Sequence, residues 1–189
     1  LATFAFWCRR KHLESRKREY EESGSRRGYG LAFHITPGNV PINCAFSFVF
    51  GLLAGNSNIV RLPSSRFPQV EMLCSEINKL KAKGNIDTLS ECNALIRYKS
   101  TSEASKIFSR HSDLRLIWGG DESVAEIRKY PVKPRCMDLV FPDRFSFSVI
   151  GIQAIEQCND AELKDLAQKF YNDTYLFDQD GCSSARVIM

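Results

Sequence analysis

One of the seven cysteines, Cys182, lies in a sequence context suited to covalent chemistry. It stands between Gly181 and Ser183-Ser184. These small neighbours leave room around the thiol and allow a backbone N–H to face a group bound to it. Most cysteines in globular proteins are inert core residues, and composition alone gives Cys182 about one chance in seven of being the reactive one. The other six are structural by default, namely Cys8, Cys44, Cys74, Cys92, Cys136 and Cys158.

A second candidate, Asn39, lies in the segment Thr36-Pro37-Gly38-Asn39-Val40-Pro41. The two prolines fix φ and the glycine permits unusual backbone angles, so the segment is expected to form a stiff, preorganised loop. The side-chain amide of an asparagine can donate a hydrogen bond to an oxygen that gains negative charge during a reaction. The alternative is that Asn39 only supports a Pro-Gly turn.

Two further places offer groups for an anion. Arg61, followed by Ser64-Ser65, provides a cation and two hydroxyls without a carboxylate, which suits a phosphate. Gly119-Gly120 precedes an expected helix, and glycines there let a ligand approach the positive helix N-terminus closely. Each has a plain alternative, because Arg61 can be a solvated residue at a strand end and Gly119-Gly120 only a turn.

Strands and helices alternate along the chain. Strands are expected at 29–35, 57–62, 93–99, 113–118 and 145–152, and another begins at 185. Helices are expected at 4–22, 42–54, 67–83, 102–109, 122–130 and 160–171. This alternation predicts an α/β fold with a largely parallel sheet. His34 lies in an apolar strand and is expected to be a hydrogen-bonded core residue rather than a catalytic base.

Charge is unevenly distributed among the 189 residues. The chain has 26 Lys and Arg against 22 Asp and Glu, and residues 1–27 hold eight of the bases and four of the acids, so the remainder is neutral. The interleaved glutamates, including the pair Glu14–Arg18, favour a solvated helix over a nucleic-acid or membrane-surface contact. The longest apolar stretch, Ile42 to Leu53, is too short and too interrupted to span a membrane.

The cysteines are odd in number and widely scattered, which favours a reducing, cytoplasmic compartment. No His, Cys or Asp cluster has the spacing of zinc ligands, so no metal site is expected.

Three segments occur in a distinctive order: Phe33 to Pro41 with Ile59 to Pro63, then Trp118 to Glu122, then Asp180 to Ser184. Together they resemble the acyl-CoA reductase family of bacterial luminescence, a branch of the aldehyde dehydrogenase superfamily. The resemblance runs from about residue 28 to residue 189. It implies a Rossmann-type dinucleotide-binding domain at 28–150 and the start of a catalytic domain at 151–189. The leading basic helix expected within 1–27 lies outside the resemblance. We therefore expect a fragment that is inactive alone and whose final strand is unpaired.

Members of that family form a thioester on a cysteine and reduce it with a hydride from a nicotinamide. The resemblance thus implies NADPH-dependent reduction of a fatty acyl-CoA, or another activated acyl thioester, to an aldehyde. It implies that Cys182 is the nucleophile and that Asn39, with the backbone N–H of Cys182, binds the oxyanion. Ser64 stands where many NAD-preferring relatives carry a glutamate, which favours NADPH and leaves NADH as the other option. The implied cofactor-binding residues are Pro37, Arg61, Ser64, Gly119 and Gly120.

Hydrolytic aldehyde dehydrogenases carry a glutamate that activates water shortly before a Gly-Gly-Lys. Laying Leu139–Arg144 on that motif puts Val140 at the glutamate position, with Asp138 and Asp143 displaced from it. The missing base favours the acyl-CoA reaction, and a hydrolytic NAD(P)-dependent aldehyde dehydrogenase is the alternative. The resemblance also implies an acyl-transferring partner, either a synthetase or an acyl-carrier protein, and a homo-oligomer when the protein is complete.

Overall fold

The structure is a computed structural model, and it describes residues 1–22, 24, 26–84, 87–99, 103–175, 179 and 181–189. The chain forms two compact units, Leu1–Pro142 and Asp143–Met189, which we call the first and second unit. This division precedes the boundary expected at 150/151. The reason is that strand β6 (Ser146–Ser148) pairs with β7 (Ala185–Ile188) near the end of the chain.

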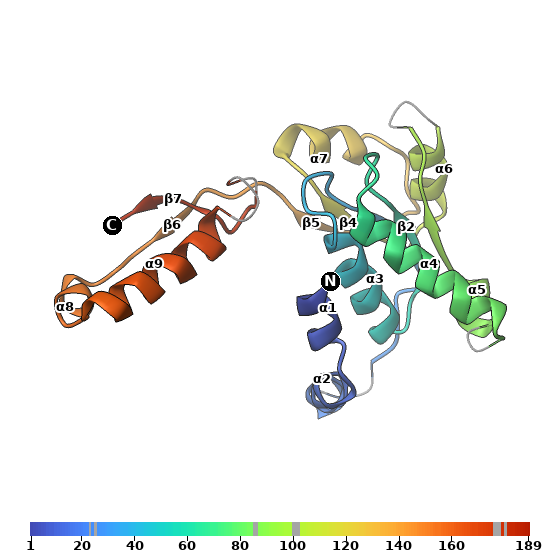
Figure 1. Cartoon of the computed structure of the whole chain (residues 1–189). Coiled ribbons are helices and arrows are strands. Elements are labelled where there is room, and N and C mark those ends of the chain that lie inside the picture. The colour runs from blue at the N-terminus through green and yellow to red at the C-terminus, as the bar shows by residue number, and fades with distance from the viewer. Residues whose placement is uncertain (23, 25, 85–86, 100–102, 176–178, 180) are drawn as a thin grey trace. The chain divides into compact units, whose positions relative to one another are not determined.

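The first unit is built on a five-stranded sheet in which every strand pair is parallel. The strands are β1 (Leu31–Ile35), β2 (Ser57–Arg61), β3 (Asn93–Ile96), β4 (Leu114–Trp118) and β5 (Met137–Phe141). Their order across the sheet is β3-β2-β1-β4-β5 (Figure 1). This is the order of doubly wound nucleotide-binding folds, so the predicted α/β class with a parallel sheet is confirmed.

Helices cover both faces of this sheet. They are α3 (Asn43–Leu53), α4 (Pro68–Ala82), α5 (Asp87–Cys92), α6 (Ala104–His111) and α7 (Asp121–Arg128). On one face, Cys44 of α3 and Val70 of α4 pack with Val60 and Leu62. On the other face, Phe108 of α6 and Val124 of α7 pack with side chains of the strands, namely Phe33, Ile35 and Ile117. Because both faces are covered, the central strands β1 and β4 are mostly apolar, with one polar residue each.

His34 lies in the central strand β1 and is completely buried. Its Nδ1 lies 2.8 Å from Oγ of Ser47 on α3, and its Nε2 lies 2.9 Å from Oδ1 of Asn58 on β2. Burial lowers the pKa of the imidazole to about 4. The prediction of a hydrogen-bonded core histidine is confirmed, and the residue ties β1 to its neighbouring helix and strand.

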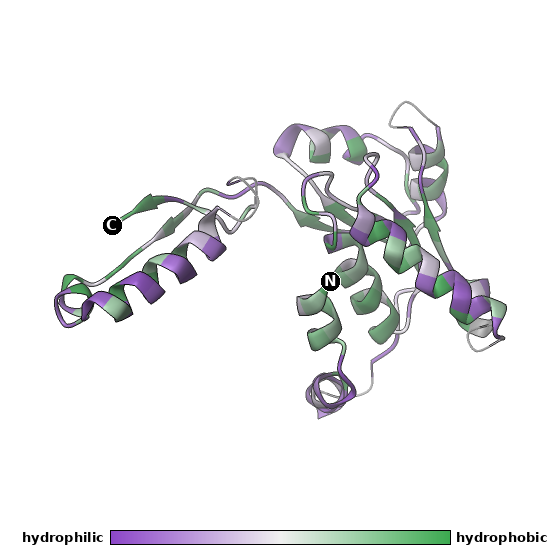
Figure 2. Ribbon diagram, viewed as in Figure 1, coloured by the Kyte–Doolittle hydropathy of each residue, from purple (hydrophilic) through white to green (hydrophobic). Residues whose placement is uncertain are grey.

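The prediction of one helix over 4–22 is wrong. The chain forms α1 (Ala2–Trp7) and then α2 (Arg10–Glu22), because Phe4 and Trp7 pack their rings on Phe46 and Phe50 of α3 and the chain turns away afterwards. Helix α2 is mostly hydrophilic (Figure 2) and carries ion pairs between neighbouring turns. In these pairs Glu14 contacts Arg10, not Arg18 as the spacing suggested.

The second unit contains β6 and β7 in a parallel pair, with helices α8 (Ile152–Glu156) and α9 (Asp160–Thr174) between them in sequence. Helix α9 begins with a capping box in which Asn159 and Glu162 each accept a backbone N–H. The expectation of an unpaired final strand is wrong, since Ala185 pairs with Ser146. The strand expected at 145–152 is shorter, because the chain leaves it before Gly151 and enters α8.

Candidate functional site

The carboxyl ends of the strands in the first unit form one edge of the sheet, which is the upper edge in Figure 1. Strands β1 and β4 are neighbours there, and the chain proceeds from β1 toward β3 on one side and from β4 to β5 on the other. In open α/β sheets ligands bind at such a switch point, outside the carboxyl ends of the strands. Six of the seven predicted site residues lie in or directly after the ends of β1, β2 and β4: Pro37, Asn39, Arg61, Ser64, Gly119 and Gly120.

The loop after β1 carries Pro37 and Asn39, and Asn39 is exposed in it. The loop is joined to the start of α3 by a hydrogen bond from the N–H of Asn43 to the carbonyl of Val40, at 3.1 Å. The thiol of Cys44 also lies 3.3 Å from the carbonyl oxygen of Pro41. Asn39 is therefore presented on a short loop that is fixed at its exit.

Arg61 is the last residue of β2 and is held at two points. Its carbonyl oxygen accepts a hydrogen bond of 2.6 Å from Oγ1 of Thr36, which follows β1. Its guanidinium lies 5.1 Å from the centre of the Tyr98 ring, which follows β3. Ser64 lies exposed in the same loop as Arg61. A cation and a hydroxyl thus stand together at the carboxyl edge of the sheet.

Two residues of this region, Arg97 and Tyr98, were not found from the sequence. The Nε of Arg97 donates to the carbonyl of Pro63 at 2.9 Å, and its Nη2 lies 2.7 Å from Oε1 of Glu71. Arg97 therefore fixes the loop after β2 from the neighbouring strand. The only sequence signal was the run Arg97-Tyr98-Lys99 after a short apolar strand, and it did not show which loop these residues would meet.

Gly119 and Gly120 join β4 to the N-terminus of α7. Gly120 is the N-cap of that helix, no side chain caps it, and a Cβ on Gly120 would meet nothing within 4 Å. The first backbone N–H groups of the helix are thus approachable by an anion. Asp121 and Glu122 in the first turn already carry negative charge to this end of the helix and oppose a second anion.

Cys182 belongs to the second unit and lies exposed in a turn. The turn is closed by the N–H of Ser184, which donates to the carbonyl of Gly181 at 2.9 Å. The carbonyl of Cys182 accepts a hydrogen bond of 2.6 Å from Oγ of Ser146 on β6. The backbone around the thiol is thereby fixed while the thiol side remains accessible. Asp180, part of the same motif, lies outside the described residues.

Four of the other six cysteines are less suited to act as thiolates because their pKa values are raised. Burial raises the pKa of Cys44 to about 11, and it also raises the pKa of Cys8, Cys74 and Cys136. The thiol of Cys158 donates to the carbonyl of Ala154 within its own helical turn, at 3.0 Å. Cys92 is exposed at the end of α5.

The carboxylates near Val140 are engaged elsewhere. Val140 lies in β5 and packs against the cluster that contains Ile117. The carboxylate of Asp138 binds Arg115 through two contacts of 2.7 Å, and the Arg115 side chain is only 2% exposed. Asp143, in the second unit, accepts the N–H of Arg144 at 2.8 Å. Asp138 is therefore not a free general base, whereas Asp143 is exposed.

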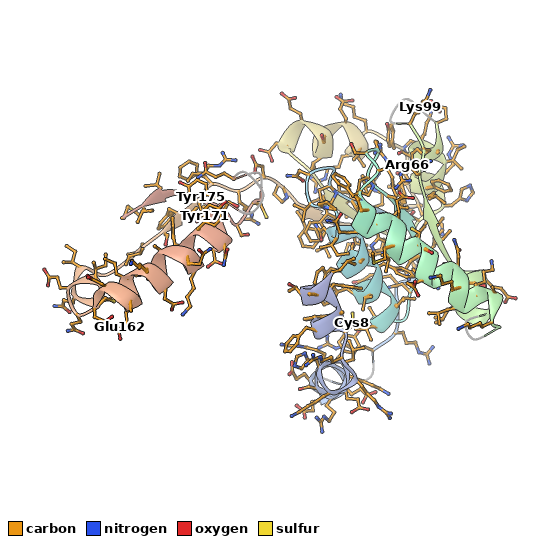
Figure 3. All side chains as sticks on the ribbon, in the orientation of Figure 1. Cys8, Arg66, Lys99, Glu162, Tyr171 and Tyr175 are labelled. Atoms are coloured by element: carbon orange, nitrogen blue, oxygen red, sulfur yellow. The ribbon has the colours of Figure 1, made fainter. Side chains whose placement is uncertain are left out.

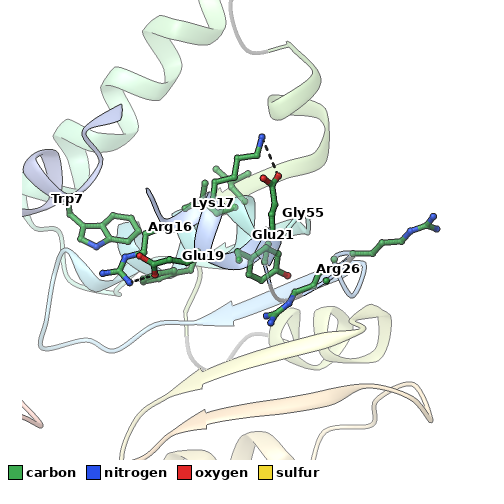
Figure 4. Close-up of a pocket in the computed structure, with 15 residues that line it drawn as sticks. Trp7, Arg16, Lys17, Glu19, Glu21, Arg26 and Gly55 are labelled. Carbon is green, nitrogen blue, oxygen red and sulfur yellow. Dashed lines mark hydrogen bonds and ion pairs between the residues drawn. The ribbon is translucent and has the colours of Figure 1, made fainter. Parts of the chain in front are cut away.

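A cleft of about 1300 Å³ lies on the opposite side of the first unit, between α2 and the turn that joins α3 to β2 (Figure 4). Two ion pairs, Arg16–Glu19 and Lys17–Glu21, cross its surface. Its lining contains none of the predicted site residues. Within the described parts of the chain, no helix is long and apolar enough to cross a membrane and no group of three His, Cys, Asp or Glu side chains could hold a metal ion.

Most of the chain has an aldehyde dehydrogenase-like fold. Solved structures of this class match most of the chain. One is aldehyde dehydrogenase 21 from Physcomitrella patens, with a TM-score of 0.62 and 14% identity over 86% of this chain and 31% of that chain. Another is an aldehyde dehydrogenase from Bartonella henselae, with a TM-score of 0.57 and 18% identity over 86% of this chain and 32% of that chain.

Within this class the chain belongs to the acyl-CoA reductase (LuxC) family, whose model matches residues 8–189. The predicted family is confirmed. The chain is 27% identical over 159 residues to the long-chain acyl-protein thioester reductase of Aliivibrio fischeri, and 25% identical over 160 residues to that of Vibrio harveyi. Each match covers 84% of this chain and 31% of the relative, so the chain spans less than a third of the length of these relatives.

Proposed function

We propose that the complete protein reduces a fatty acyl thioester, either acyl-CoA or an acyl-protein, to an aldehyde with NADPH. The observation that carries the proposal is the grouping of six predicted residues at the carboxyl edge of the sheet, in a chain that matches the acyl-CoA reductase family over residues 8–189. We assign the first unit, from residue 28 onward, to cofactor binding and the second unit to the beginning of a catalytic domain.

The reaction starts with Cys182. Its thiolate attacks the carbonyl carbon of the acyl thioester, and the electron pair of the carbonyl moves onto its oxygen. The side-chain amide of Asn39 and the backbone N–H of Cys182 donate hydrogen bonds to that oxygen. The thiol of the acyl donor then leaves as a thiolate, and the acyl group remains on the sulfur of Cys182. The exposure of Cys182 and the raised pKa values of Cys8, Cys44, Cys74 and Cys136 support this assignment.

When bound, the nicotinamide cofactor supplies the hydride that converts the acyl thioester on Cys182 to the aldehyde. The residues at the carboxyl edge suit a phosphorylated dinucleotide. The uncapped start of α7 after Gly119-Gly120 offers backbone donors to a pyrophosphate, although Asp121 and Glu122 in its first turn oppose the added negative charge. Arg61 and Ser64 offer a cation and a hydroxyl without a carboxylate in the segment 62–70, and a carboxylate there would repel a 2′-phosphate. This donor set favours NADPH over NADH.

Reduction is favoured over hydrolysis by the surroundings of β5. A general base would have to activate water beside the acyl-enzyme, yet Val140 packs into the core and Asp138 is paired with Arg115. Without that base, the thioester on Cys182 persists until hydride transfer. As parts of the same proposal, the complete protein receives its acyl group from a synthetase or carrier protein, forms a homo-oligomer and works in the cytoplasm.

The test uses the complete protein, myristoyl-CoA and no reductant. Mass spectrometry is expected to find one acyl adduct on Cys182, absent in Cys182→Ala and retained in the control Cys92→Ala, which removes another exposed thiol. An adduct that persists in Cys182→Ala would refute the assignment of the nucleophile. Acid formed from an aldehyde without CoA would support the hydrolytic alternative. Residues 1–189 alone are expected to show no hydride transfer.

A further inference from the structure

Tyr98 stands beside the predicted cofactor residues although nothing in the sequence pointed to it. It follows β3, and its ring lies under the guanidinium of Arg61, 5.1 Å from the ring centre to the guanidinium carbon. We propose that Tyr98 is a positioning residue that holds Arg61 to bind the 2′-phosphate of an adenosine, and so sets the preference for NADP over NAD. This inference rests on the proposed dinucleotide site.

The contact leaves the binding side of Arg61 free. A guanidinium that stacks on an aromatic ring uses its flat face, whereas its five N–H groups point outward in the plane. These in-plane donors are the ones that form paired hydrogen bonds with a phosphate. The contact of the guanidinium with the ring of Tyr98 therefore restricts the rotamers of Arg61 without a hydrogen bond to its donors, and less conformational entropy is lost when a phosphate binds.

Tyr98 is itself held firmly. Its hydroxyl lies 2.8 Å from Oγ of Ser105 in α6, and Ser105 is only 5% exposed. Its ring also packs on Phe108 of the same helix, with ring centres 6.1 Å apart. Burial raises the pKa of the phenol, so the ring contacts Arg61 as a neutral group. Helix α6 thus holds Tyr98 in place, and Tyr98 in turn contacts Arg61.

The backbone of Arg61 is fixed from the other side of β2. Oγ1 of Thr36, at the exit of β1, donates to the Arg61 carbonyl at 2.6 Å. Contacts from both neighbouring strands therefore set the place of the residue, one on its main chain and one on its side chain. An arginine that only contacted solvent at a strand end would require neither the Thr36 contact nor the Tyr98 contact.

The charge around this pair is positive. Arg66 and Lys99 lie in the loops that follow β2 and β3 (Figure 3), at the same edge of the sheet as Arg61. The first acid after β2 is Glu71, and it pairs with Arg97 at 2.7 Å. Arg97 therefore engages the first carboxylate that follows Arg61 in the sequence. An added phosphate is expected to be bound more strongly here than a free ribose hydroxyl.

The test measures binding to residues 1–189 by isothermal titration calorimetry. The probes are adenosine 2′,5′-bisphosphate, adenosine 3′,5′-bisphosphate and adenosine 5′-monophosphate, which need only the adenosine half of the site. We expect the 2′,5′-bisphosphate to bind at least about tenfold more tightly than the monophosphate, as a charged hydrogen bond allows. Tyr98→Leu should weaken the 2′,5′-bisphosphate by about three- to tenfold, the range of a partly buried cation–π contact, and leave the monophosphate unchanged.

Two variants separate positioning from structure. Tyr98→Phe keeps the ring under Arg61 and should retain the preference. Val124→Ala removes part of the same core cluster from α7 and takes part in none of the contacts described for Tyr98 and Arg61, so it should leave the ratio of the two affinities unchanged. Thermal unfolding shows that each variant is folded.

The remaining outcomes would overturn the inference in distinguishable ways. If Tyr98→Leu weakened the binding of the 2′,5′-bisphosphate and of the monophosphate equally, Tyr98 would have a purely structural role. Equal affinity for the 2′,5′- and 3′,5′-bisphosphates would overturn the assignment to a 2′-phosphate, while the acyl adduct on Cys182 would still test the reductase. If the wild-type chain bound none of the probes, both this inference and the proposed cofactor site would fail.

Discussion

His34 makes the stability of the first unit depend on pH. The ring is completely buried between α3 and β2, and Ser47 and Asn58 occupy both of its nitrogens. Burial lowers its pKa in the folded protein from 6.5 to about 4. Between these values the unfolded chain binds a proton at this residue and the folded chain does not. Acidification therefore favours the unfolded state.

The size of the effect follows from the two pKa values. A difference of about 2.5 pH units corresponds to about 3 kcal/mol, at roughly 1.4 kcal/mol for each unit. Stability contributed by the neutral ring is fully present above about pH 6.5. It is lost progressively as the pH falls to about 4, and protonation of His34 causes no further loss below that value.

The assay is urea unfolding, followed by circular dichroism, at pH values between 7.5 and 4.5. His34→Gln keeps polar atoms near Ser47 and Asn58 but removes the titrating ring, so the difference in unfolding free energy between variant and wild type should shrink by about 2 kcal/mol from pH 7 to pH 5. His111→Gln, at an exposed position, controls for the loss of a histidine as such. Parallel pH curves for His34→Gln and the wild type would refute the reasoning.

Three further substitutions probe the same framework. Gly51→Ala should lower the free energy of unfolding by about 1–3 kcal/mol, because the new Cβ would overlap the Asn58 amide oxygen, which buried hydrogen bonds hold in place. Gly38→Ala, whose Cβ would meet nothing within 4 Å, should leave the free energy unchanged in the same urea assay. Asp138→Ala should lower the free energy of unfolding by about 3–5 kcal/mol, because it leaves the buried Arg115 without its carboxylate. Asp165→Ala, which breaks an exposed ion pair, should lower it by less than about 1 kcal/mol. Equal losses would contradict the structural role of the Arg115–Asp138 pair. In the complete protein, Asn39→Ala should lower kcat by about 100- to 1000-fold with little change in KM, and an unchanged kcat would exclude Asn39 as an oxyanion donor.

Elements with a clear hydrophobic period were predictable from the sequence. Strand β1 and helices α3 and α4 lie within one or two residues of their expected bounds. The elements that were not predicted are short: α5 has six residues, and α8 and β5 have five each. Strand β5 also follows the segment 131–134, whose two prolines interrupt the pattern. Short segments carry too few periodic positions to be distinguished from loops.

The candidate site was predictable where a motif marked it. Asn39, Gly119 and Gly120 stand in motifs that the family resemblance identified, and the strand order places the loops that carry them at one edge. The contacts of Arg97 with Pro63 and of Tyr98 with Arg61 were not predictable, because they join residues more than 30 positions apart across two strands. Only the pairing of β2 with β3 shows which loops meet.

The distribution of charge also acquires a different meaning in the structure. The excess of bases lies in residues 1–27, where Arg10, Arg16 and Lys17 of α2 each pair with a glutamate on the same helix. The neutral remainder contains Arg61, whose guanidinium lies over the ring of Tyr98 and is followed by no acid in the segment 62–70. We therefore expect an anionic ligand to bind in the part of the chain that carries no excess of charge. The position of a cation relative to the strand ends, and not the local surplus of charge, indicates where such a ligand binds.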